Sequence, residues 1–157
     1  MEELLIAPCG MNCSVCSFYL AEKNNLRNTG FTTPYCPGCR PRGRNCTNRK
    51  MCESLKNGEI RLCYECDNFP CNALEQLDKN YKNKYHMSMI KNLNYIKDHG
   101  IGEFMNKERK KWECPDCGKT MCCHNGICYT CGTDKLDHPR PKSIWTSNST
   151  EVSTESD

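Results

Sequence analysis

The sequence contains few of the large apolar residues that build an ordinary hydrophobic core. Leucine, isoleucine, valine and phenylalanine together make up about 15% of its 157 residues. A chain with less than about 20% of these residues is usually disordered unless something else holds it together. Small proteins with little apolar core are commonly stabilised by disulfides or by bound metals. The 16 cysteines can supply either kind of cross-link.

Long apolar segments are missing as well. The first residues, MEELLIAP, are acidic and contain only a short apolar run, so they do not resemble a secretory signal peptide. No window approaches the roughly 18 apolar residues that indicate a membrane-spanning helix. We therefore expect a cytoplasmic protein without a membrane segment. In that compartment thiols stay reduced, and clustered cysteines bind metal in preference to forming disulfides.

A strong excess of one charge is also absent. The formal net charge of +3 counts every cysteine as neutral, whereas metal-bound cysteines are thiolates. One zinc ion with four thiolates carries two negative charges, so three such sites would bring the net charge to about −3. The overall charge therefore gives little support for a polyanionic partner.

The pattern along the chain predicts a small irregular α+β fold that is stabilised by metal and has a few short helices. Apolar residues at helical spacing predict helices from about residue 12 to 25, over 71–85, from Met89 to Gly100 and over 102–112. A short strand is expected to begin at Glu59.

Composition also suggests a division into four parts. We expect a cysteine-rich metal-binding domain over 1–84, a helical connector over 85–111, a zinc ribbon over 112–135 and a disordered tail over 136–157.

The C-terminal cysteines follow a specific pattern. The segment CPDCGKTMCCHNGICYTCG, residues 114–132, contains two Cys-x-x-Cys-Gly turns, and an Asn-Gly pair that is typical of a hairpin turn lies between them. Two such turns on a hairpin complete a closed tetrahedral shell, which predicts a structural zinc-ribbon hairpin. The predicted Zn²⁺ ligands are Cys114, Cys117, Cys128 and Cys131.

Three further residues between these turns are left without an assigned role. Cys122 and Cys123 are adjacent, so in a strand at most one of them can face the ion. His124 can either replace a ligand or serve as a hairpin residue near the metal.

Ten more cysteines lie upstream and are enough for two four-ligand sites. Cys36/Cys39 and Cys63/Cys66 have the Cys-x-x-Cys spacing at which a metal site forms most easily. The sequence does not fix which cysteines share a site, and Cys46 and Cys52 stay unassigned. The predicted metal ligands in this part are Cys9, Cys13, Cys16, Cys36, Cys39, Cys63, Cys66 and Cys71.

The triplet Cys9, Cys13 and Cys16 raises an alternative to zinc. Its C-x3-C-x2-C spacing is the one by which radical S-adenosylmethionine enzymes hold a 4Fe-4S cluster, although this chain is too short for their barrel. Closely spaced thiolates suit an iron–sulfur cluster as well as zinc. The N-terminal cofactor is therefore predicted to be Zn²⁺ or, alternatively, a 4Fe-4S cluster.

Four segments together resemble a known family. APCGMNCSVCSFY, CPGCRPRGRNC, CESLKNGEIRLCYECDNFPCNAL and HGIGEFMNKERKKWECPDCGKTMCCHNGICYTCG are similar to the prokaryotic cysteine-rich domain-of-unknown-function family 3795. The resemblance covers roughly residues 7–132, and the C-terminal ribbon is similar to an extension of some members. It implies a small metal-binding protein without specifying a reaction.

Two functions follow as hypotheses. The first is a non-enzymatic interaction or regulatory module for a macromolecular partner, protein or nucleic acid, with the basic stretches 40–50 and 107–111 as candidate surfaces. The alternative is an iron–sulfur protein with a redox or sulfur-handling role. None of the four histidines lies in an HExxH-like pattern, so no motif predicts hydrolytic zinc catalysis.

Overall fold

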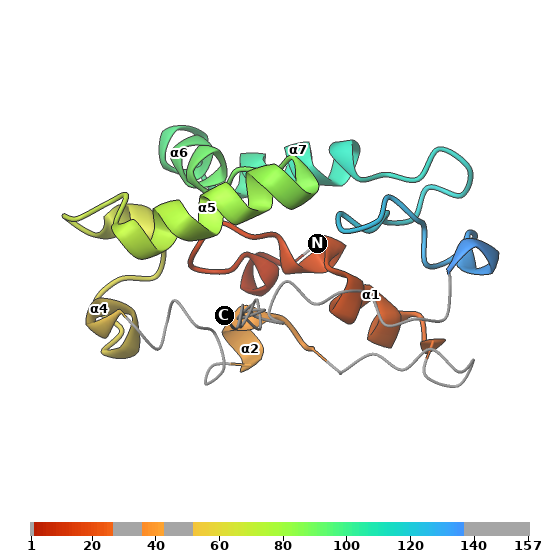
Figure 1. The fold of residues 1–157 in the computed structure, drawn as a ribbon, viewed down its shortest axis with the longest axis horizontal. Helices are drawn as coiled ribbons and strands as arrows, with labels where there is room; N and C mark the ends of the chain where they lie inside the picture. The colour runs from red at the N-terminus through yellow and green to blue at the C-terminus, as the bar shows by residue number, and fades with distance from the viewer. Residues whose placement is uncertain (1, 27–35, 43–51, 137–157) are drawn as a thin grey trace, which may run out of the picture.

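The computed structural model describes residues 2–26, 36–42 and 52–136. In chain order the elements are η1 Glu3–Leu5, η2 Cys13–Val15, α1 Ser17–Lys23, α2 Cys39–Arg42, α4 Glu53–Lys56, η4 Cys63–Glu65, α5 Asn72–Tyr85, α6 Met89–His99, α7 Ile101–Lys111 and η5 Thr133–Lys135. Figure 1 shows α5, α6 and α7 grouped on one side of the molecule, with the N-terminal segment, α1 and α2 on the other.

The predicted α+β fold class is wrong. The described ranges contain no strand, and β pairing is limited to isolated antiparallel bridges such as Glu113–Thr120 and Met121–Cys128. The strand expected at Glu59 is replaced by turns and bends. The zinc-ribbon hairpin is likewise not formed. A β ladder needs several consecutive extended residues, and the closely spaced turns of the cysteine segment leave only single pairs.

The three long helices agree with the sequence predictions. α5 buries Leu74 and Tyr81, and α6 buries Met89, Leu93 and Ile96 on one face. These spacings place apolar side chains on one stripe of a helix. The predicted helices over 71–85, from Met89 to Gly100 and over 102–112 are therefore confirmed within one or two residues.

Side-chain hydrogen bonds fix the junction between α5 and α6. Ser88 accepts from the amide of Lys91 at 3.1 Å and so caps the start of α6. The buried Asp78 of α5 accepts from the Ser88 hydroxyl at 2.7 Å and from the amide of Ile90 at 3.0 Å. The cap of one helix is thus held by a carboxylate of the preceding helix.

One buried cluster joins the N-terminal segment to these helices. It includes Ile6 and Val15 from the start of the chain, Tyr81 from α5 and Phe104 from α7. The buried Glu108 of α7 also accepts hydrogen bonds from Asn12 and Trp112. The division into domains at residues 84 and 111 stays a prediction, although this core draws on both sides of residue 84.

A smaller buried cluster lies where the C-terminal segment packs against α1. Leu20 and Ala21 of α1 contact Cys122, Tyr129 and Leu136 there. Leu136 is the first residue of the predicted disordered tail, and the rest of that tail lies outside the described residues. None of the helices in the described ranges is long and apolar enough to cross a membrane.

Gly10 gives a test of how tightly the N-terminal loop packs on α6. Its φ is +86°, and a Cβ there would lie 2.8 Å from the carbonyl oxygen of Met89 and 2.9 Å from Cγ of Leu93. Because both the backbone strain and the clash are unfavourable, Gly10→Ala is expected to lower the free energy of unfolding by about 2–4 kcal/mol in urea titrations.

The matched control for this change is Gly102→Ala. Gly102 lies within α7, and a Cβ there meets nothing within 4 Å. Because alanine has a higher helix propensity than glycine, the free energy of unfolding of this variant is expected to rise by up to about 1 kcal/mol. Equal effects of the two variants would contradict the packing described for Gly10.

Candidate metal centre

The C-terminal cysteines lie on two short turns that follow α7. In the first turn, the amide of Cys114 donates to the carbonyl of Lys119 at 2.7 Å, and Gly118 donates back to Cys114 at 2.9 Å. Gly118 has a φ of +68°, which glycine adopts without strain. In the second turn, a Cβ at Gly132 would lie 3.0 Å from the carbonyl oxygen of Cys128. The backbone conformation at Gly118 and the close backbone contact at Gly132 thus explain why glycine occupies these two positions.

These turns bring four sulfurs together. The Sγ atoms of Cys114, Cys117, Cys128 and Cys131 all lie within 4.8 Å of one another. The Cys114–Cys131 distance is 3.7 Å, and the Cys117–Cys128 distance is 3.6 Å. In a tetrahedral shell with metal–sulfur distances of about 2.3 Å, neighbouring sulfurs lie about 3.8 Å apart. The group can therefore hold a single metal ion.

Hydrogen bonds shift the pKa values of Cys128 and Cys131 in opposite directions. Burial raises the pKa of Cys128, but bonds from the amides of Cys131 and Thr130 outweigh it, and the pKa falls to about 7. Bonds between sulfurs, with Cys117 as the largest contributor, raise the pKa of Cys131 to about 12. A bound cation displaces the protons of such thiols, because coordinating thiols are deprotonated.

The shell lies at the surface but is closed. Cys114 and Cys128 are buried, whereas Cys117 and Cys131 are exposed. The group contains four thiols and neither a histidine nor a carboxylate. Four protein ligands fill a tetrahedral shell and leave no position for a substrate, which is the arrangement of structural sites.

His124 and its neighbours dock this segment onto α1. The Nδ1 atom of His124 accepts from the amide of Ser17 at 3.2 Å, and the amide of Cys123 donates to the carbonyl of Val15 at 2.9 Å. The His124 ring also packs on Tyr85, with centroids 4.7 Å apart. His124 therefore caps a helix from a distant part of the chain, and no local sequence signal indicated that contact.

Cys122 and Cys123 lie in different buried clusters. Cys122 lies in the smaller cluster against α1, and Cys123 lies in the main core. Burial raises the pKa of both thiols. They are thus buried cysteines on opposite sides of the segment, and neither belongs to the four-sulfur group.

The first predicted ligands of the N-terminal part are core residues. Cys9, Cys13, Cys16 and Cys36 are all buried in the main cluster. The amide of Cys39 donates to the sulfur of Cys13 at 3.3 Å. Burial raises the pKa of Cys16 to about 12. No three of the described thiols here meet the 4.8 Å spacing of the C-terminal group. Their role as ligands stays a prediction.

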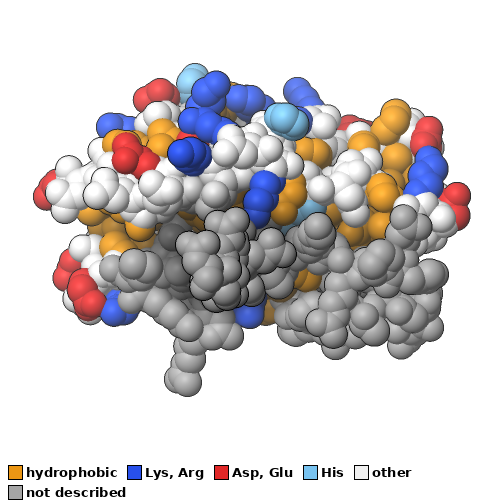
Figure 2. Space-filling view, viewed as in Figure 1, with side chains coloured by type: hydrophobic (Ala, Val, Ile, Leu, Met, Phe, Trp, Pro, Cys, Tyr) orange, Lys and Arg blue, Asp and Glu red, His pale blue; other side chains and the backbone are white. Residues whose placement is uncertain are grey.

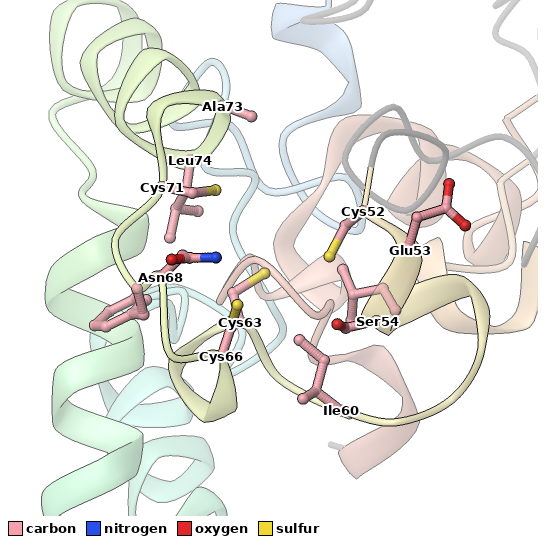
Figure 3. A pocket seen from close by; sticks show the side chains of 12 residues that line it. Cys52, Glu53, Ser54, Ile60, Cys63, Cys66, Asn68, Cys71, Ala73 and Leu74 are labelled. Atoms are coloured by element: carbon pink, nitrogen blue, oxygen red, sulfur yellow. The ribbon is translucent and has the colours of Figure 1, made fainter.

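The remaining predicted ligands lie together at another place. Cys63, Cys66 and Cys71 line one cavity of about 290 Å³, and Cys52 lines it too (Figure 3). The sequence analysis named the first three as ligands without assigning them to one site, and it left Cys52 unassigned. Cys46 lies outside the described residues.

A basic cleft is formed by the C-terminal ends of α5 and α7 together with α6. It has a volume of about 570 Å³, and its lining contains four lysines and one histidine but no acidic residue. Figure 2 shows lysine and arginine side chains gathered over these helices. The predicted basic stretch 107–111 contributes two of the four lysines, Lys107 and Lys111. The charged residues of the lining are Lys82, His86, Lys91, Lys107 and Lys111.

The other predicted basic stretch is only partly described. Arg40 and Arg42 lie in α2, and Arg40 donates to the backbone carbonyls of Ile6 and Arg61. Arg40 is therefore used in packing the N-terminal segment. The rest of the stretch, from residue 43 onward, lies outside the described residues.

Residues 5–76 match the family described as a protein of unknown function, DUF3795. This part of the chain belongs to that family, as the resemblance of the cysteine pattern indicated. The matched range includes the cavity lined by Cys52, Cys63, Cys66 and Cys71, whereas the C-terminal four-sulfur group lies beyond it. No curated protein and no solved structure matched the chain.

The burial of His124 leads us to expect that the protein loses stability in mild acid. Burial lowers its pKa from 6.5 to about 4, so the folded state holds the ring neutral while the unfolded chain binds a proton below about pH 6.5. The stability is complete above that pH and falls as pH drops from 6.5 toward 4. We expect a loss of about 1–2 kcal/mol between pH 7.5 and 5.5 in urea titrations.

His124→Gln removes the titrating ring and is expected to flatten this part of the pH profile. Because the two proteins differ only at residue 124, the difference between the two profiles reports His124. His99→Gln at an exposed ring of α6 is the control for loss of a histidine. Identical slopes for wild type and His124→Gln would contradict the assignment.

Proposed function

We propose that this chain is a zinc-binding interaction module in which the four C-terminal cysteines hold a structural Zn²⁺. The observation that carries the proposal is the sulfur spacing of 3.6–3.7 Å, which fits one tetrahedral ion. Four thiolates in a tetrahedron suit zinc or iron, and a single divalent ion at such a site is held more tightly as zinc than as Fe²⁺.

The proposed role of the ion is to hold the cysteine segment against α1. Residues 112–131 contribute few apolar side chains to the cores, and their β pairing is limited to single bridges. Zinc binding to such small segments contributes about 10–16 kcal/mol in isolated zinc-finger peptides. The ion would thus fix the turns from which His124 and Tyr129 reach α1 and its surroundings. This proposal assumes a reducing compartment such as the cytoplasm, where these thiols stay unoxidised.

The basic cleft supports a nucleic-acid partner for the module. Four lysines converge on one hollow without a lining carboxylate, and such a concentration of positive charge attracts phosphates. Lys82 is already paired with Asp78, which leaves Lys91, Lys107 and Lys111 as the stronger candidates for phosphate contacts. The ring of Tyr95 lies beside them, with Lys107 Nζ 3.8 Å from its centroid.

Zinc content tests the metal site. Cys117→Ser and Cys131→Ser each remove a ligand at an exposed position, so both variants are expected to contain one zinc ion fewer per chain by elemental analysis. Limited proteolysis is expected to cut within residues 112–136, because the segment loses its cross-link.

Cys122→Ala is the control from the same segment, since that thiol is buried away from the four-sulfur group. It is expected to keep its full zinc content. An unchanged zinc count in the two ligand variants would contradict the site.

Salt dependence tests the cleft. Each phosphate contact that is lost reduces the slope of log affinity against log salt by about 1. Lys91→Gln/Lys107→Gln is therefore expected to weaken nucleic-acid binding and to reduce the slope by about 2 in fluorescence anisotropy titrations.

Lys97→Gln/Lys110→Gln removes two exposed lysines of the same helices that do not line the cleft. This control changes the net charge equally and is expected to leave the affinity nearly unchanged. Equal losses in the two double variants, or no binding by the wild type at low salt, would contradict the role of the cleft.

A further inference from the structure

A second group of four cysteines surrounds the cavity between α4 and the start of α5. Figure 3 shows the side chains of Cys52, Cys63, Cys66 and Cys71 around this space, with their sulfurs directed into it. None of the four is in a disulfide. Thiols from two helix starts and one 3-10 turn thus meet at one place, although 19 positions separate the first from the last.

Local backbone structure places these four thiols around the cavity. Cys52 and Cys71 precede the first residues of α4 and α5, and neither side chain caps its helix. Cys63 is the first residue of η4 and Cys66 directly follows it, and the amide of Cys66 donates to the carbonyl of Cys63 at 3.3 Å. The sulfurs of all four cysteines are directed toward the cavity (Figure 3).

The spacing of these sulfurs differs from that of a single-ion shell. Among the described residues, only the C-terminal group has three or more such ligand atoms within 4.8 Å of one another. No three of the cavity sulfurs therefore lie as close to one another as the sulfurs around one zinc ion, which are about 3.8 Å apart. An iron–sulfur cluster holds its cysteine sulfurs farther apart, because its own iron and sulfide atoms lie between them.

The size and walls of the cavity also suit a cluster. Its volume of about 290 Å³ provides room for a group of several atoms, whereas one ion fits in the gap between touching sulfurs. Apart from the cysteines, the lining combines the apolar Leu55, Ile60, Phe69 and Leu74 with the polar Glu53, Ser54 and Asn68. The apolar side chains reduce the contact of a bound group with water, which is one of the ways in which a protein controls such a cluster.

We propose that Cys52, Cys63, Cys66 and Cys71 bind an iron–sulfur cluster through four thiolates. The site lies inside the range that matches the family and is separate from the zinc site proposed above. It assigns a role to Cys52 and groups three cysteines that the sequence alone could not assign to one site. The buried triplet Cys9, Cys13 and Cys16 is not part of it.

The test is reconstitution of the full-length protein with iron and sulfide under anaerobic conditions. We expect iron and acid-labile sulfide in equal amounts, with a broad visible absorption. Cys52→Ser and Cys71→Ser are expected to remove both the iron and the absorption while keeping the C-terminal zinc. Cys117→Ser is the matched control at an exposed cysteine, and it is expected to lose zinc while keeping the cluster.

Thiol alkylation of the wild-type protein gives a second measurement that does not depend on folding of a variant. With the cluster bound, Cys52, Cys63, Cys66 and Cys71 are expected to resist iodoacetamide, and chelation of the iron is expected to expose them. A second zinc ion per chain without any sulfide would overturn the proposal. A cluster that is still formed by Cys71→Ser would also overturn it. So would a cluster that protects Cys9, Cys13 and Cys16 from alkylation and leaves the four cavity cysteines reactive. The zinc content, measured separately, tests the C-terminal site and so distinguishes failure of that site from failure of the cluster site.

Discussion

The convergence of four sulfurs, which we propose is held together by a metal ion, is the feature on which the C-terminal part of this structure depends. Four thiols converge to within 3.6–3.7 Å across pairs, a spacing that brings their negative charges close together once they ionise. A cation at the centre would compensate those charges and would cross-link two turns that have only single β bridges. Docking of His124, Cys123 and Tyr129 against the rest of the chain follows from where these turns are held.

The helical part of the molecule depends on a different balance. Its core is small, and cysteines fill positions that leucine or valine fill in other proteins, as Cys9 and Cys16 do beside Val15 and Tyr81. Reduced cysteine packs as a small apolar residue. Sulfur therefore has two separate uses in this chain. Thiols facing Tyr81 are buried as core, whereas those at the ends of turns are directed toward a cavity or toward one another.

Local patterns predicted the three long helices and the convergence of the four C-terminal cysteines, whereas the helix expected over about 12–25 is a 3-10 turn over Cys13–Val15 followed by α1 over Ser17–Lys23. The stripe of Met89, Leu93 and Ile96, and the two Cys-x-x-Cys-Gly turns, act over a few residues and therefore leave a readable signal. The predicted α+β class was wrong because the Asn-Gly turn of the cysteine segment is flanked by too few extended residues to form a β ladder. The grouping of Cys52 with Cys71, the capping of α1 by His124 and the basic cleft all join distant segments, which spacing along one chain does not encode.

Zinc K-edge X-ray absorption spectroscopy on the intact, reduced protein reports the atoms bound to the ion and so tests the proposed site. We expect a first shell of four sulfurs at about 2.3 Å, with no nitrogen or oxygen neighbour. A shell that contains nitrogen or oxygen, or fewer than four sulfurs, would contradict the closed four-thiolate site formed by Cys114, Cys117, Cys128 and Cys131.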